Sequence, residues 1–130
     1  MLWRHNMAEL KITPEMQQIL IELQTFQQQM QTVLLQKESL NIQNMETNKA
    51  LEELKKATNE DVYKAVGPIL IKSTKKELEK ELSEKKETLD LRIKSLQKQE
   101  DRLKDKLKDS QEKFEQLMKP QEGSEKIRAE

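Results

Sequence analysis

The sequence predicts an all-α dominated fold, a long antiparallel two-helix coiled coil with a β-hairpin at its bend that joins an intersubunit β-barrel. Two leucine-rich heptad repeats of nearly equal length flank one short segment of β-forming residues, 62–72. Charged residues make up 37% of the 130 residues, whereas Phe, Trp and Tyr together make up 3%. This composition does not suit a compact globule, and the heptad period argues against disorder.

The first helix is expected over residues 13–58. Thr13 is a good N-cap, Pro14 suits the first helical position because its missing N–H would have no partner there, and Glu15 favours the positive end of the helix dipole. Mostly apolar residues then recur at alternating spacings of three and four, which is the coiled-coil period. This seam consists of Met16, Ile19, Leu23, Phe26, Met30, Val33, Lys37, Leu40, Asn44, Thr47, Leu51, Leu54 and Thr58.

A second helix is expected over residues 74–118. It begins with a capping box, because Thr74 is followed three residues later by Glu77. Its seam has the same period and is surrounded by charged residues that keep the helix soluble. The seam consists of Glu79, Leu82, Lys86, Leu89, Ile93, Leu96, Glu100, Leu103, Leu107, Ser110, Phe114 and Leu117.

Folding the chain back around residues 66–67 sets the predicted register of the two seams. It places Leu40 near Ile93, and it leaves Lys37 one layer from Glu100. These two polar seam residues can neutralise each other. We hypothesise that the pair helps to fix the register, since apolar layers alone would tolerate a slip of one heptad.

The segment 61–72 is expected to form the hairpin, with Gly67 providing the conformational freedom that a tight turn needs. An isolated two-stranded hairpin is marginal in water, and this one leaves two open edges and several apolar side chains exposed. We therefore expect neighbouring subunits to cover it. The residues expected in this assembly are Val62, Tyr63, Val66, Gly67, Ile69, Leu70 and Ile71. The alternative is that the segment is only a loop between helices.

Residues 1–12 are expected to be a flexible N-terminal extension and residues 119–130 a disordered tail after Pro120. Either Met1 or Met7 could be the natural start. No apolar run is long enough for a signal peptide or a membrane span, so a cytoplasmic protein is expected.

The composition argues against an enzyme and against nucleic acid as a partner. Lys plus Arg and Asp plus Glu both number 24, so there is no strong basic field. His5 is the single histidine, Cys is absent, and two Gly residues cannot build a phosphate-binding loop. No cofactor and no metal are expected.

The central motif resembles the beta-type class of the prefoldin family. It reads Val62-Tyr63-Lys64-x-x-Gly67-x-x-Leu70-Ile71-Lys72 and is followed by Lys76-Glu77 at the start of the second helix. The resemblance covers roughly residues 10–118, and the single hairpin is like the beta class because the alpha class has a longer linker with two hairpins. It implies a hexamer of two alpha-type and four beta-type subunits, with a central double β-barrel and six coiled coils that hang from it.

The resemblance further implies an ATP-independent chaperone, a holdase that captures non-native polypeptide clients at the coiled-coil tips and delivers them to a group II chaperonin in the cytosol. Such a function needs apolar surface that the coiled coil does not bury. Two groups fit: residues at the free helix ends, and a stripe on the first helix at heptad positions e and f. The candidate client-binding residues are Met16, Ile19, Leu20, Ile21, Leu23, Phe26, Leu35, Ile42, Leu107, Phe114, Leu117 and Met118.

The same sequence allows other interpretations. The residues at the helix ends could only close the seam, and a local shift of register could turn parts of the stripe into the seam. From a different class, the chain could be a homodimeric coiled-coil scaffold without chaperone activity, whose hairpin is a mere turn. A membrane-surface helix is disfavoured because neither helix combines a basic face with a broad apolar one.

Overall fold

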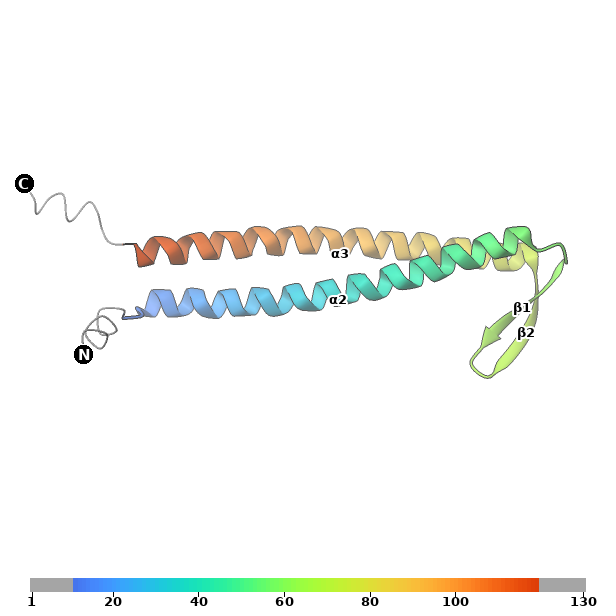
Figure 1. Ribbon diagram of the computed structural model, residues 1–130, viewed down its shortest axis with the longest axis horizontal. Coiled ribbons are helices and arrows are strands. Elements are labelled where there is room, and N and C mark those ends of the chain that lie inside the picture. Colours follow the sequence, from blue (N-terminus) through green and yellow to red (C-terminus); the bar gives the residue numbers. More distant parts are fainter. Residues whose placement is uncertain (1–10, 120–130) are drawn as a thin grey trace, which may run out of the picture. The chain divides into compact units, whose positions relative to one another are not determined.

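The computed structural model describes residues 11–119 and contains four elements (Figure 1). In chain order these are α2 (Pro14–Lys56), β1 (Asp61–Val66), β2 (Ile69–Thr74) and α3 (Lys75–Met118). The two helices run antiparallel with the two-stranded hairpin between them, as the sequence predicted. The expected flexible extension and disordered tail lie almost wholly outside the described residues.

Both helices begin at the predicted caps. The Thr13 Oγ1 atom accepts a hydrogen bond from the Met16 backbone N–H at 3.1 Å, and the Thr74 Oγ1 atom accepts one from the Glu77 N–H at 3.2 Å. Each cap therefore satisfies one of the backbone donors that a helix start leaves without a partner.

The element ends inside the bend differ slightly from the predicted ones. Helix α2 ends at Lys56 rather than at residue 58, because the Ala57 N–H donates to the Leu54 carbonyl at 3.2 Å and tightens the last turn. Strand β2 continues to Thr74, which pairs with Asp61. The strands are thus longer than the β-forming residues alone indicated.

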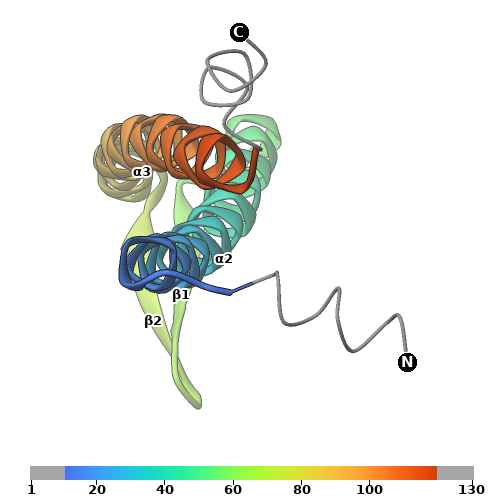
Figure 2. The same cartoon turned by 90° about the vertical axis from the view of Figure 1, so that its left-hand side faces the viewer.

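The described chain divides into two compact units. The hairpin unit is Thr32–Glu100, which holds the hairpin and the adjoining parts of both helices. The terminal unit comprises residues 11–31 and 101–119 of the described chain. Within the hairpin unit, Figures 1 and 2 show the hairpin projecting to one side of the helices.

The predicted seam forms the core of both units. The buried members of the seam are Met16, Ile19, Val33, Thr47 and Leu54 in α2, and Leu89, Leu96, Glu100, Leu103 and Ser110 in α3. The remaining seam residues are half-buried, except for Thr58 and Leu117, which are exposed. The heptad assignment is therefore confirmed, and the alternative in which the outer stripe turns into the seam is not observed.

The hairpin turn depends on Gly67. Its φ of 56° lies in the left-handed region, and with Pro68 it forms a two-residue loop whose positive φ comes first, as in a type II′ turn. Strands β1 and β2 pair in antiparallel register from Val66 with Ile69 to Asp61 with Thr74.

Gly67→Ala should destabilise the hairpin by about 1–2 kcal/mol, because a residue with a Cβ atom is strained in the left-handed region. No atom lies within 4 Å of a Cβ added there, so the cost is conformational rather than a clash. Gly67→Asn should cost less, since Asn tolerates this conformation better. Thermal unfolding of the isolated chain measures both, and equal losses for Ala and Asn would contradict this account.

Candidate functional site

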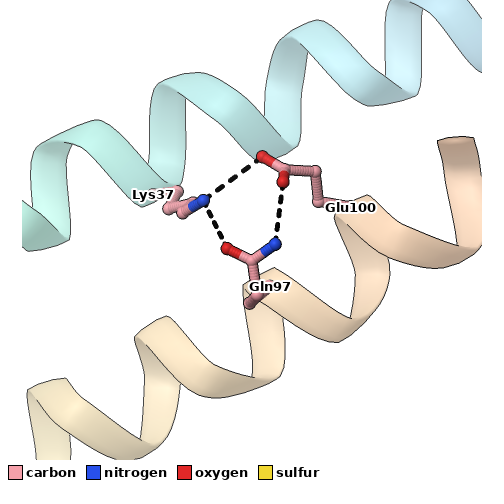
Figure 3. Close-up of polar contacts among 3 residues, drawn as sticks. All are labelled: Lys37, Gln97 and Glu100. Atoms are coloured by element: carbon pink, nitrogen blue, oxygen red, sulfur yellow. Dashed lines mark hydrogen bonds and ion pairs between the residues drawn. The ribbon is translucent and has the colours of Figure 1, made fainter.

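The coiled-coil seam of the hairpin unit includes a polar layer (Figure 3). The Lys37 Nζ atom donates hydrogen bonds to Gln97 Oε1 and, at 3.3 Å, to Glu100 Oε1. The Gln97 Nε2 atom donates to Glu100 Oε2 at 2.9 Å. Glu100 is only 5% exposed, and each of its two carboxylate oxygens accepts a hydrogen bond. The predicted contact between Lys37 and Glu100 is confirmed.

A second polar contact links the two helices in the same unit. The Asn44 Nδ2 atom donates to Asp90 Oδ1 at 2.9 Å. The buried Asn44 Oδ1 atom has no hydrogen-bond partner among residues 11–119. Both contacts agree with the predicted register, in which residues 40 and 93 lie opposite each other.

The outer stripe of α2 is exposed along both units. We define it as the apolar residues at heptad positions e and f, which are Leu20, Ile21, Leu34, Leu35 and Ile42. All five side chains are exposed, and none belongs to the buried core. Helix α3 carries one apolar residue of comparable exposure in the hairpin unit, Leu91. The apolar outer surface of this unit therefore belongs mainly to α2.

The structure adds one residue to this surface that sequence reasoning missed. Met45 is 71% exposed and lies three residues beyond Ile42, at heptad position b. Positions b, e and f are adjacent on a helix, so Met45 extends the stripe toward the hairpin. The heptad assignment could have found it, because an unbranched apolar residue at b has no partner in a two-helix coiled coil.

The candidate residues at the helix ends fall into three classes of burial in the terminal unit. Met16 and Ile19 are buried. Leu23, Phe26, Leu107 and Phe114 are half-buried. Leu117 and Met118 are exposed, as is Leu20. Contact between another polypeptide and the buried pair would require the helices to separate there.

Phe26 has a cation over its ring. The Lys106 Nζ atom lies 5.7 Å from the centroid of the Phe26 ring, within the range of a cation–π interaction. This contact covers one face of the ring and leaves Phe26 half-buried rather than freely exposed.

The hairpin has one face that is exposed throughout. The register places Tyr63, Ala65 and Leu70 on the same face, and every residue of that face is exposed, with Leu70 at 71%. The opposite face is half-buried at Val62, Lys64 and Ser73 and exposed nearer the turn, at Val66, Ile69 and Ile71. A two-stranded sheet also leaves both of its edges unpaired. The hairpin is thus apolar on both faces and open on both sides.

Residues 11–119 hold neither a cluster of metal-ligating side chains nor a membrane-spanning helix. No three of His, Cys, Asp or Glu in this range come together in a way that could hold a metal ion. Neither described helix is sufficiently apolar over a membrane's thickness to cross a bilayer.

Comparison with known proteins gives consistent matches over most of the chain. A family model described as "Prefoldin subunit" matches residues 17–121. The chain is 44% identical over 114 residues to the prefoldin subunit beta of Archaeoglobus fulgidus, covering 87% of this chain and 98% of that protein. It is 41% identical over 128 residues to the prefoldin subunit beta of Saccharolobus islandicus, covering 95% and 100%. The crystal structure of the prefoldin beta subunit from Thermococcus strain KS-1 matches with a TM-score of 0.78 and 37% identity, over 85% of this chain and 97% of that one.

Proposed function

Because this chain belongs to the prefoldin family as a beta subunit, we propose that it is an ATP-independent holdase subunit that captures unfolded polypeptides and delivers them to a group II chaperonin in the cytosol. The prefoldin family consists of chaperone subunits rather than enzymes. The chain's own contribution to capture is exposed apolar surface on a long helical support.

The proposed assembly is a hexamer of two alpha-type subunits and four copies of this chain, joined through their hairpins. Its support is the exposure of the Tyr63 and Leu70 face together with the two open strand edges. A sheet with apolar residues on both faces and unpaired edges aggregates unless other strands cover it. Pairing hairpins from several subunits into a barrel removes both problems at once.

The observation that carries client capture is the exposed outer stripe of α2. Its side chains are exposed in each unit, Leu20 and Ile21 in the terminal unit and Leu34, Leu35 and Ile42 in the hairpin unit. We propose that clients contact the stripe and the exposed end residues Leu117 and Met118 first. The half-buried residues Leu23, Phe26, Leu107 and Phe114, and the buried Met16 and Ile19, become available where the helix ends fray.

The native mass of the complex in extracts of the source cells tests the assembly. Four copies of this chain with two of another chain would support the proposed hexamer. A homodimer with no second subunit would contradict it and leave a coiled-coil scaffold as the function.

Replacing Ile21, Leu35 and Ile42 together with Ser should reduce client capture strongly while changing stability little. Exposed substitutions usually alter the free energy of unfolding by no more than about 0.5 kcal/mol each. The measurement is suppression of aggregation of a chemically denatured protein, with the melting temperature recorded in parallel. Leu91→Ser on α3 is the matched control, since it removes an equally exposed apolar side chain outside the stripe. Normal capture by the triple variant would show that the stripe does not bind clients.

A further inference from the structure

Helix α3 begins with two cations at the end of the helix where cations are unfavourable. Lys75 and Lys76 occupy its first two positions, and the N-terminus of a helix carries partial positive charge. A lysine there is less favourable for helix stability than a neutral residue. Lys76 is exposed, whereas Lys75 is half-buried, so the two lysines differ in their surroundings.

Lys75 contacts the opposite end of the other helix. Its Nζ atom donates hydrogen bonds to the Lys55 carbonyl at 3.3 Å and to the Ala57 carbonyl at 3.2 Å. The last carbonyls of a helix have no partner within it and carry partial negative charge. The ammonium group of Lys75 therefore satisfies the C-terminal end of α2.

The backbone of Lys75 makes a third contact, with the connection that leads into β1. Its N–H donates to the Glu60 carbonyl at 3.0 Å. Lys75 thus joins the end of α2, the connection before β1 and the start of α3. The chain enters the hairpin through this connection and leaves it at the junction of β2 with α3, so Lys75 makes contacts at both ends of the hairpin.

An ion pair also joins the hairpin to a described helix, and it is more exposed than Lys75. The Lys64 ammonium group pairs with the Glu81 carboxylate of α3, but the two side chains are 41% and 52% exposed. Ion pairs in such surroundings contribute little, because water and salt screen them. We therefore expect Lys75 to matter more than Lys64 for the position of the hairpin.

We propose that Lys75 is a positioning residue that fixes the angle at which the hairpin leaves the coiled coil in the hairpin unit. Without its ammonium group, the last carbonyls of α2 turn to water and the connection before β1 gains freedom. The hairpin then samples a wider range of directions. The consequence for capture rests on the proposed function, because the hairpin angle sets the direction in which each coiled coil leaves the assembly.

Distances between two spin labels on the full chain test this proposal. The chain contains no Cys, so Pro68→Cys at the hairpin turn and Glu84→Cys on α3 can be labelled selectively, and both positions are exposed within the hairpin unit. Diluting the labelled chain with unlabelled chain removes distances between subunits. We expect one narrow distance distribution for the labelled chain that keeps Lys75. For the labelled Lys75→Met variant we expect a broad distribution without a single maximum.

Three matched variants separate positioning from general stability. Lys75→Arg keeps a cation with several donors and should keep the narrow distribution. Lys76→Met and Lys64→Met remove neighbouring lysines and should also keep it. A narrow, unshifted distribution for Lys75→Met would overturn the proposal, whether or not the melting temperature falls. Loss of the helical signal in Lys75→Met would overturn it too, since Lys75 would then be required for folding. The labels report the angle without any client, so a failure to capture clients leaves this result unaffected.

Discussion

Leu89→Ala should lower the free energy of unfolding by about 2–4 kcal/mol, because truncating a buried leucine removes its apolar contacts and leaves a cavity. Leu89 is 4% exposed, the lowest value among the apolar core residues of the described chain. It lies on α3 in the hairpin unit, at a heptad position that faces α2. A coiled coil of two helices has one layer of core, so neighbouring side chains cannot fill the space from a second layer.

Leu91→Ala provides the matched control for this prediction. It is the same substitution on the same helix, two residues away, but Leu91 is 65% exposed. We expect a change of less than about 0.5 kcal/mol there. Urea unfolding followed by circular dichroism measures both variants. If the two lost similar stability, the seam assignment of α3 would be incorrect.

The sequence predicted the seam correctly because the heptad period is a local property of the chain. Even polar seam residues follow it: Thr47 and Ser110 are among the most buried residues of the structure. Small hydroxyl side chains can be buried in a helix when they bond to its backbone, as Thr47 does to the Gln43 carbonyl at 2.8 Å. Position in the heptad therefore determined burial more strongly than residue polarity did.

The contacts made by long polar side chains were only partly predictable. The heptad register brought Lys37 opposite Glu100, but it gave no reason to include Gln97, which lies at heptad position e. Lys75 was overlooked for a related reason. Its partners are the backbone carbonyls of Lys55, in the last turn of α2, and of Ala57, just after that helix, and every residue has a carbonyl whatever its side chain. Capping rules describe a helix by its own residues, so they do not identify a cap that another helix supplies.

The sequence predicted which apolar surfaces are exposed, but it did not identify what binds to them. The stripe residues Leu35 and Ile42 were expected to lie outside the seam, and they do. The partners of these stripe residues are other chains, whose sequences are not contained in this one. The same holds for the face of the hairpin that carries Tyr63 and Leu70.

Lys37→Leu should destabilise the chain by about 2–3 kcal/mol, because it leaves the Glu100 carboxylate in the seam without its cation. Breaking a fully buried ion pair costs more, but the Lys37 side chain is 23% exposed and water partly screens the charge. The hydrogen bond from Gln97 remains and satisfies one carboxylate oxygen. Urea unfolding measures the loss.

Combining Lys37→Leu with Glu100→Leu should recover most of that stability, since an apolar pair replaces a buried ionic one at little or no cost. We expect the loss to appear instead in register, because the new layer is equivalent to its apolar neighbours. Spin labels at Ser39→Cys and Ser95→Cys, which line one groove of the hairpin unit, report this directly. A slip of one heptad displaces one helix by about 10 Å at 1.5 Å per residue, so a slipped population gives a second distance. A double variant that kept one distance and an unchanged oligomeric state would exclude a role for this polar layer in setting the register. Apolar packing and the hairpin would then be sufficient to align the two helices.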